Sequence, residues 1–244
     1  MRRQQRGGAA TYIDTVLSVA TANLIAYWPQ TETSGTVADN AEGTAARDGT
    51  YSGVTLAQIA DPFGGFLSPL YDGVNDVLNV DSASLEAAWN HSLWSLLLWH
   101  KVANVGVWTD GSTDKAMVFQ VDVNNYFKIN KTSTSNQITV ETRSGGTTDN
   151  ISKSGLSNTT WSMSVITVDR ANDRIRWYLD NVLVGTATTL GTWAGTNFNP
   201  AVIGANTAGG GEPWNGYLSH AAVWAGVELT TTEVNTLWNG GPLS

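Results

Sequence analysis

Residues 92–102 have the sequence SLWSLLLWHKV. Leu and Trp occupy positions 93, 94 and 96 to 99, so both alternating faces of the stretch are apolar. Successive side chains of a strand point to opposite faces of a sheet. A strand that is apolar on both faces belongs in the middle of a sheet covered on both sides. The stretch therefore predicts a central, fully buried strand.

Shorter runs with strand character lie on both sides of this central stretch. We expect strands at 24–28, 66–71, 77–80, 92–102, 117–121, 137–143, 163–167, 174–179, 182–184, 201–204 and 217–224, with a loop over residues 30–50. The pair Asp180-Asn181 is typical of a tight turn between two strands. About a dozen short strands separated by turn residues predict an all-β fold made of two antiparallel sheets.

Two short helices are expected at the ends of the chain. Thr11 and Asp14 form a weak capping pattern at the start of a helix over residues 11–19. Thr230 and Glu233 form a capping box ahead of Val234, Leu237 and Trp238, and Gly240-Gly241-Pro242 ends that helix. We predict a tail and short helix over residues 1–22, followed by one domain over residues 23–244.

Charge separates the start of the chain from the rest. The net charge is −8, yet Arg2, Arg3 and Arg6 lie within the first six residues. The tail is interpreted either as a plain extension or as an anchor on a larger assembly. The acidic body argues against duplex nucleic acid as a partner. There is no cysteine, no apolar run long enough to span a membrane, and no apolar segment typical of a secretory signal behind the basic start.

Several segments resemble the concanavalin A-like lectin/glucanase superfamily, and in particular its laminin G-like domains. The segments are LIAYWP at 24–29, ETSGT at 32–36, YDGVND at 71–76, WNGYL at 214–218 and LTTTEV at 229–234. They follow the order found in that family. The resemblance implies a jelly-roll sandwich that binds carbohydrate or protein ligands, often with a calcium site near its rim. Such domains are frequent in secreted bacterial proteins and on tailed phages.

The resemblance also directs attention to metal ligands. Members of the family carry acidic residues where Ser219 and His220 stand in this chain. Calcium prefers several oxygen ligands, which Asp39, Asp48 and Asp72 could supply. The alternative is that these three aspartates only cap loops and turns. Calcium is the one cofactor that the sequence suggests.

Catalytic residues are not evident. Glucanases of the same superfamily carry a Glu-x-Asp-x-x-Glu motif, which places carboxylates on one face of a strand. This chain lacks the motif, and Glu141 is the only carboxylate within its predicted strand. His91, His100 and His220 are too far apart in sequence to form a metal-binding motif. We therefore predict a protein without enzymatic activity.

The aromatic residues offer candidates for ligand binding. Trp108, Trp193 and Trp214 lie near predicted loops, beside Gly and polar residues. Aromatic faces with a few convergent polar groups are typical of carbohydrate sites, and exposed aromatics also mark protein interfaces. The remaining alternative is that these side chains fill the ends of the sandwich core.

These observations leave three functional hypotheses. The first is a phage virion surface protein, such as a capsid decoration protein or a head or tail fibre. Its tail would bind a capsid or other virion protein, and it would form a homo-oligomer. The second is a carbohydrate-binding lectin module of a bacterial protein, located outside the cell or on its surface. The third is a glycoside hydrolase of the same superfamily, against which the missing carboxylate motif argues.

Overall fold

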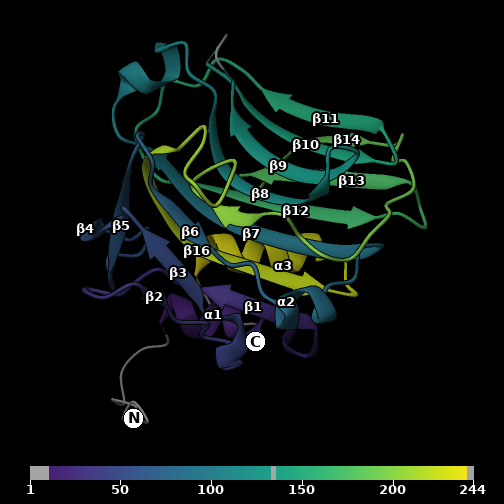
Figure 1. Ribbon diagram of the computed structural model, residues 1–244, viewed down its shortest axis with the longest axis horizontal. Coiled ribbons are helices and arrows are strands. Elements are labelled where there is room, and N and C mark those ends of the chain that lie inside the picture. Colours follow the sequence, from purple (N-terminus) through teal and green to yellow (C-terminus); the bar gives the residue numbers. More distant parts are fainter. Residues whose placement is uncertain (1–10, 133–135, 241–244) are drawn as a thin grey trace.

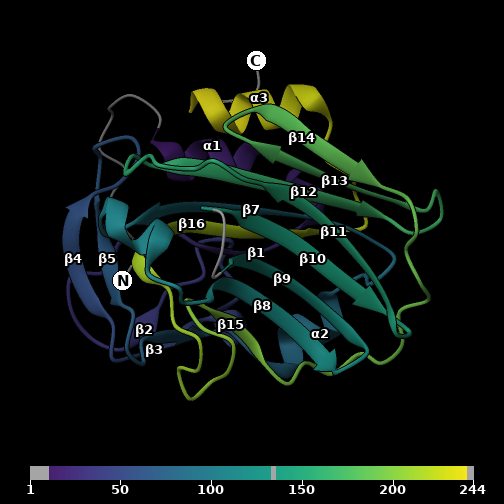
Figure 2. The same ribbon diagram turned by 90° about the horizontal axis from the view of Figure 1, so that it is seen from above.

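The computed structural model describes residues 11–132 and 136–240, which form two antiparallel sheets packed face to face (Figures 1 and 2). The first, sheet A, contains β1 (Leu24–Trp28), β4 (Thr55–Ala60), β5 (Leu67–Asp72), β7 (Leu93–Val102), β12 (Ser162–Asp169), β13 (Arg174–Leu179), β14 (Val182–Ala187) and β16 (Asn215–Ala225). Its strand order is β14-β13-β12-β7-β16-β5-β4, and β1 pairs with β16. The order places β7, the strand predicted to be central, in the middle of the sheet.

Sheet B forms the other layer. Its strands are β2 (Val37–Ala38), β3 (Gly49–Ser52), β6 (Val77–Asn79), β8 (Asp114–Asp122), β9 (Asn125–Lys131), β10 (Ile138–Ser144), β11 (Thr147–Lys153) and β15 (Ala201–Ile203). They are arranged in the order β11-β10-β9-β8-β15-β6-β3-β2. The main core lies between the sheets, where Trp94, Phe119, Phe127 and Trp177 are almost fully buried. The predicted all-β sandwich of two antiparallel sheets is confirmed.

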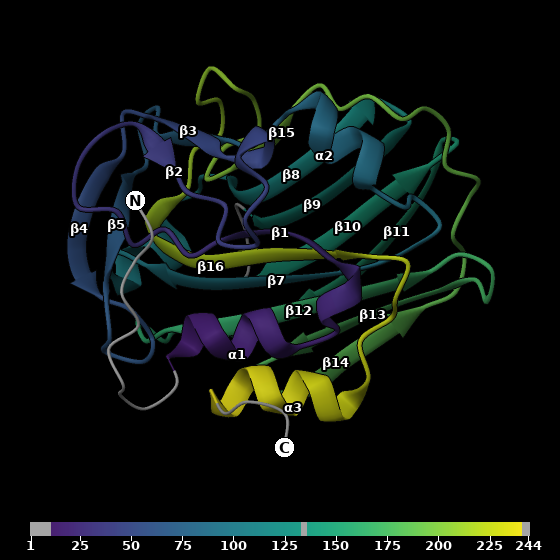
Figure 3. The same ribbon diagram turned by 90° about the horizontal axis from the view of Figure 1, so that it is seen from below.

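Helices cover the outer face of sheet A. Helix α1 (Tyr12–Ser18) and helix α3 (Thr231–Asn239) lie side by side across this face (Figure 3). Buried side chains of both helices pack against Leu97, Trp99 and Trp224 of the sheet in a second apolar cluster. Both predicted capping boxes are present, and Gly240 ends α3 with a φ of 69°. Strand β7, in the middle of sheet A, is therefore buried on both faces, as its sequence predicts.

The structure adds elements that the sequence did not predict. Residues 30–50 were expected to be a loop, but they contribute β2, the start of β3 and a 3-10 turn at Ala45–Arg47. A third helix, α2 (Ala83–Ala88), is capped by Ser82, whose hydroxyl accepts a hydrogen bond from the backbone N–H of Leu85 at 3.2 Å. Two further 3-10 segments are Thr21–Asn23 and Val105–Thr109. None of the helices in the described ranges has the length and apolar character needed to cross a bilayer.

Strand β16 carries a bulge that changes its pairing partner. Its first residues pair with β5, and its second half pairs with β1. The register shifts between Ser219 and Ala222, and His220 at this point has a left-handed φ of 49°. His220 is fully buried, with its Nδ1 hydrogen-bonded to the Tyr27 hydroxyl at 2.7 Å and its Nε2 lying 3.2 Å from the Asp61 carboxylate. These contacts stabilise a conformation that a non-glycine residue rarely adopts.

Candidate functional site

A cleft lies at one side of the sandwich, where the two sheets end. Strand β11 is the last strand of sheet B and β14 is the last strand of sheet A, and the two lie close together (Figure 1). The cleft between them, which we call the edge groove, has a volume of about 610 Å³. It is lined by Ser152, Lys153, Ser154, Leu156, Asn158, Ser162, Leu179, Asp180, Val182, Leu183 and Val184.

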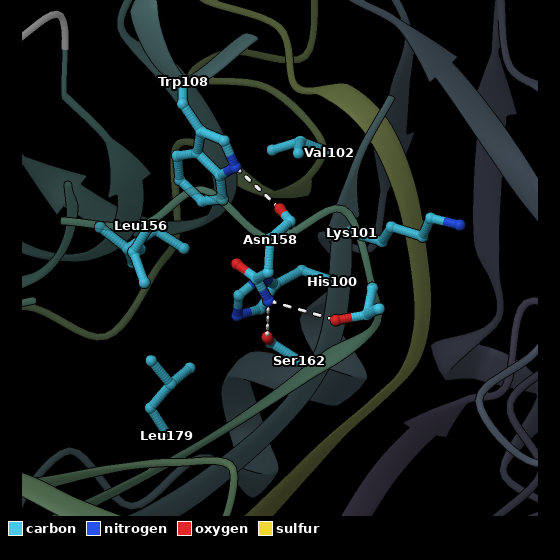
Figure 4. A pocket seen from close by; sticks show the side chains of 10 residues that line it. His100, Lys101, Val102, Trp108, Leu156, Asn158, Ser162 and Leu179 are labelled. Atoms are coloured by element: carbon cyan, nitrogen blue, oxygen red, sulfur yellow. Dashed lines mark hydrogen bonds between the residues drawn. The ribbon is translucent and has the colours of Figure 1, made fainter. Parts of the chain in front are cut away.

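A row of hydrogen bonds runs along the floor of the edge groove. The amide nitrogen of Asn158 donates to Oγ of Ser162 at 3.1 Å (Figure 4). The Ser162 hydroxyl in turn donates to Oδ2 of Asp180 at 3.2 Å. The other carboxylate oxygen of Asp180 accepts a hydrogen bond from the backbone N–H of Met163 at 2.8 Å. Each polar group is therefore held in position before a ligand arrives, which reduces the ordering cost of binding.

The position of Asp180 follows from the turn that carries it. Asp180 and Asn181 have left-handed φ values of 51° and 63°, as a two-residue hairpin turn requires, and this confirms the predicted turn between β13 and β14. The turn directs the carboxylate back toward the start of β12. Burial raises the pKa of Asp180 above its ordinary value, because the charged form is less well solvated there.

The edge groove deepens into a small recess beside His100 and Trp108 (Figure 4). Its free volume is about 10 Å³, enough for roughly one water molecule. The indole nitrogen of Trp108 donates to the backbone carbonyl of Asn158 at 2.8 Å and thereby fixes the loop above the recess. Nε2 of His100 lies 3.0 Å from Oγ of Ser164, and burial lowers the pKa of His100 to about 4. The imidazole is therefore neutral at physiological pH.

The opposite wall of the edge groove is apolar and accessible. Val182 is 67% exposed and Leu183 is 48% exposed, although both are hydrophobic residues on a strand. Leu156 and Val184 extend this wall toward the interior. An apolar wall facing a fixed polar row suits a ligand with one apolar face and several hydroxyl groups.

The predicted tryptophan site is not assembled. Trp108 and Trp214 are 4% and 1% exposed, so neither offers a ring face to a ligand at the surface. Trp108 instead supports the recess of the edge groove, and the Trp214 indole nitrogen donates to the carbonyl of Lys101 at 3.4 Å. Trp193 is half-buried on the long loop before β15, away from the other two. The interpretation of these residues as fillers of the core holds for Trp108 and Trp214.

Two of the three predicted metal ligands lie in one cleft. Asp39 and Asp48 line a second cleft of about 470 Å³, which is bounded by Ile13 and Leu17 of α1. Oδ1 of Asp48 accepts a hydrogen bond from the backbone N–H of Asn40 at 2.9 Å. Asp72 is not part of this cleft.

Asp72 instead caps the turn after β5, where its Oδ1 accepts a hydrogen bond from the backbone N–H of Val74 at 2.8 Å. Within residues 11–132 and 136–240, no three His, Asp or Glu side chains are grouped closely enough to hold a metal ion. Arg2, Arg3 and Arg6, the predicted anchor, lie outside the described residues.

Sequence reasoning did not identify the edge groove. Asn158 stands in the sequence Asn-Thr-Thr, which has only the pattern of a glycosylation site, and Asp180 is part of a predicted turn. Neither pattern indicates that the two side chains share a cleft. The signal that could have been used is the run Val182-Leu183-Val184, an uncharged strand at the edge of a sheet.

The arrangement defines a lectin-like jelly-roll domain. A family model described as "Concanavalin A-like lectin/glucanases superfamily" matches residues 72–235, about two thirds of the chain. The chain belongs to this superfamily. A search of curated proteins finds no relative of the chain.

Solved structures show the same fold. The binding domain of botulinum neurotoxin serotype D is 12% identical and superposes with a TM-score of 0.66 over 89% of this chain and 52% of the toxin domain. Domain 4 of AbnA, an extracellular arabinanase from Geobacillus stearothermophilus solved in complex with arabinotriose, is 15% identical with a TM-score of 0.62. That match covers 88% of this chain and 98% of the domain. The chain spans about half the length of the toxin binding domains that it matches.

Proposed function

We propose that this chain is a non-catalytic carbohydrate-binding domain and that the edge groove binds the sugar. The observation that carries the proposal is the hydrogen-bonded row Asn158–Ser162–Asp180 facing the exposed side chains of Val182 and Leu183. A sugar ring presents hydroxyl groups at its edge and C–H groups on its face. The polar row can bind the hydroxyl groups while the apolar wall contacts the ring face.

The charges in the edge groove favour binding over cleavage. Asp180 is the only carboxylate among the residues that line it. Glycoside hydrolysis generally uses two carboxylates on either side of the scissile bond. The AbnA domain with arabinotriose supports the proposal as a domain of the same fold found with a bound saccharide.

The experiment begins with a glycan array probed with the full chain, with and without calcium. The best saccharide is then titrated by calorimetry into matched variants. Val182→Ser makes one position of the apolar wall polar, whereas Val123→Ser changes a valine that is 69% exposed on the β8–β9 turn. We expect Val182→Ser to weaken binding by about fivefold and Val123→Ser to leave it unchanged. Equal affinities of the two variants, or no array signal at all, would contradict the proposal.

A second pair of variants tests the polar row. Asn158→Ala removes the amide that donates to Ser162, and Asn150→Ala removes an exposed amide of β11 outside the groove. We expect an affinity loss of about fivefold for Asn158→Ala only, the size of one net hydrogen bond. If both variants bind like the natural chain, the sugar binds elsewhere.

We also propose that the domain is displayed on a phage virion, as a capsid decoration or fibre protein that forms a homo-oligomer. The uneven charge distribution favours this role. Three of 13 basic residues lie in the first six positions, and the other ten share residues 7–244 with 21 acidic residues. A basic tail ahead of an acidic domain suits docking on an acidic capsid surface.

The virion proposal has its own test. Mass spectrometry of purified particles should detect the chain, and replacing Arg2, Arg3 and Arg6 by Gln should reduce its copy number on the particle. Light scattering of the same variant in solution checks that its oligomeric state is unchanged. Particles that lack the chain would exclude this role and leave the sugar-binding proposal intact.

A further inference from the structure

Arg170 lies at the end of β12 remote from the edge groove and has no acidic partner. Ser162 is the first residue of β12 and Arg170 directly follows the last, so the two are about 25 Å apart along the strand. Its Nε donates to the carbonyl of His91 at 2.8 Å, and its Nη1 donates to Oγ of Ser144 at 2.7 Å. Among the described residues no carboxylate oxygen lies within 4.0 Å of its guanidinium nitrogens.

Part of the Arg170 guanidinium is left without a hydrogen-bond acceptor. Its Nη2 atom is buried and has no partner. Burial lowers the pKa of Arg170 only to about 10, so the side chain remains cationic at neutral pH. Buried donors without acceptors are rare in folded proteins, and an ordered water or a bound ion can satisfy such a donor. Because the Arg170 guanidinium is a buried cation without a counter-ion, an anion complements it better than a water molecule does.

His91 adds two more unpartnered atoms to the same place. Its Nδ1 and Nε2 are both buried and neither has a hydrogen-bond partner. Burial and the charge of Arg170 lower the pKa of His91, so the ring is neutral and one of its nitrogens is an N–H donor. His91 and Arg170 thus each carry a buried hydrogen-bond donor that no protein acceptor satisfies.

The acidic residues of the adjoining turn have other partners. Oδ2 of Asp169 accepts a hydrogen bond from the amide of Asn172 at 2.6 Å and lies 3.5 Å from Nη2 of Arg174. Asp173 accepts a hydrogen bond from the backbone N–H of Leu190 at 2.7 Å. Neither carboxylate forms an ion pair with Arg170.

Trp193 covers this group of donors. Its ring stacks on His91, with centroids 5.5 Å apart and planes 19° from parallel, and the guanidinium carbon of Arg170 lies 5.2 Å from the ring centroid. Trp193 belongs to residues 188–200, which contain no helix or strand, and it is half-buried. Its indole nitrogen donates to the nearby carbonyl of Gly195 at 3.2 Å, so rotation of this side chain breaks no hydrogen bond to either sheet.

We propose that Arg170, His91 and Trp193 form a binding site for a small oxyanion, a carboxylate or sulfate group. The oxyanion accepts hydrogen bonds from Nη2 of Arg170 and from His91, while the Trp193 indole moves aside and packs against the ligand. Charge-assisted hydrogen bonds of this kind are among the stronger ones in proteins. The site is separate from the edge groove and does not depend on sugar binding there.

The test follows the ring signals of the three histidines by NMR in the full chain during a titration with sodium sulfate at constant ionic strength. His91→Gln assigns the His91 signal, and His100 and His220, both buried elsewhere, serve as internal controls. We expect a saturable shift of the His91 signal alone. Trp193→Ala should bind sulfate at least as tightly as the natural chain, because the indole no longer covers the donors.

Two arginine variants complete the test. Arg170→Gln should weaken sulfate binding by about tenfold or more, whereas Arg176→Gln, which alters an arginine paired with Glu228 at 3.0 Å, should not. A His91 shift that never saturates in the natural chain or in Trp193→Ala would overturn the site. So would binding that persists in Arg170→Gln. If Arg170→Gln fails to fold, the presence or absence of a saturable His91 shift in Trp193→Ala decides whether the site exists.

Two further probes identify the source of the oxyanion. Glucuronate binding more tightly than acetate would assign the group to an acidic sugar, and equal binding would assign it to a free anion.

Discussion

The indole nitrogen of Trp108 lies 2.8 Å from the backbone carbonyl of Asn158 and donates a hydrogen bond to it. Trp108 follows β7, whereas Asn158 lies 50 residues later on the loop between β11 and β12. The bond fixes this loop above the recess, and the Asn158 side chain can then donate to Ser162. A buried aromatic residue thus orients the polar row of the edge groove without contacting a ligand itself.

Trp108→Phe should loosen this loop. The substitution keeps an aromatic ring but leaves the Asn158 carbonyl without its donor, so we expect the free energy of unfolding to fall by about 1 to 2 kcal/mol. Trp224→Phe is the matched control, since the Trp224 indole donates to the carbonyl of Val19 at 2.8 Å beneath α1. Urea unfolding should show similar losses in both variants. Saccharide affinity should fall only in Trp108→Phe, and an equal fall in both would refute the positioning role.

His100 should make stability depend on pH. Its pKa in the folded protein is about 4, below the ordinary value of 6.5, so as the pH falls the unfolded chain binds a proton before the folded chain does. The folded state therefore loses stability between these two values, by about 2 kcal/mol on reaching about pH 5.

His100→Asn should lack this part of the pH dependence. Urea unfolding at about pH 7.5 and about pH 5 measures it, and the loss on acidification should be smaller in the variant by about 2 kcal/mol. Desolvation also lowers the pKa of the buried His220. Because His220 is present in both proteins, its contribution to the loss of stability cancels in the comparison. The same loss in both proteins would show that His100 is not the source.

Lys131 should be important for stability because its ammonium group is buried between two carboxylates. Its Nζ lies 2.6 Å from Oδ1 of Asp110 and 3.3 Å from Oδ2 of Asp114, and its side chain is 1% exposed. Lys131→Met leaves both carboxylates without a cation and should lower the free energy of unfolding by about 3 kcal/mol. Lys128→Met, on the outer face of the same strand, should change it by less than about 0.5 kcal/mol. Chemical denaturation measures the free energy of unfolding of both variants. Equal stabilities would contradict a stabilising role of Lys131 between the two carboxylates.

Local sequence patterns predicted much of the fold because the interactions that form these elements lie between residues close together in sequence. The apolar faces of residues 92–102 require burial on both sides, and the Thr230–Glu233 capping box satisfies free backbone groups within one turn of helix. Asp180-Asn181 tolerates the left-handed conformation of its turn. The strands hidden in residues 30–50 are short and partly exposed, so their alternation is too brief to be recognised.

The candidate sites could not be predicted in the same way. The edge groove combines side chains from β11, the following loop, β12 and β14, and their proximity depends on the pairing of both sheets. Lys131 lies 21 residues after Asp110, and only the β8–β9 pairing brings the two together. Trp108 and Trp214 are next to loops in sequence, yet they point into the core.

Sugar binding in the edge groove can be tested by an NMR titration of the labelled chain with the saccharide selected on the array. We expect the amide shifts to concentrate at Asn158, Ser162, Asp180 and Leu183, and we expect mass spectrometry to recover the saccharide intact after prolonged incubation. Shifts confined to the outer face of β9 and β10, or hydrolysis of the saccharide, would contradict it.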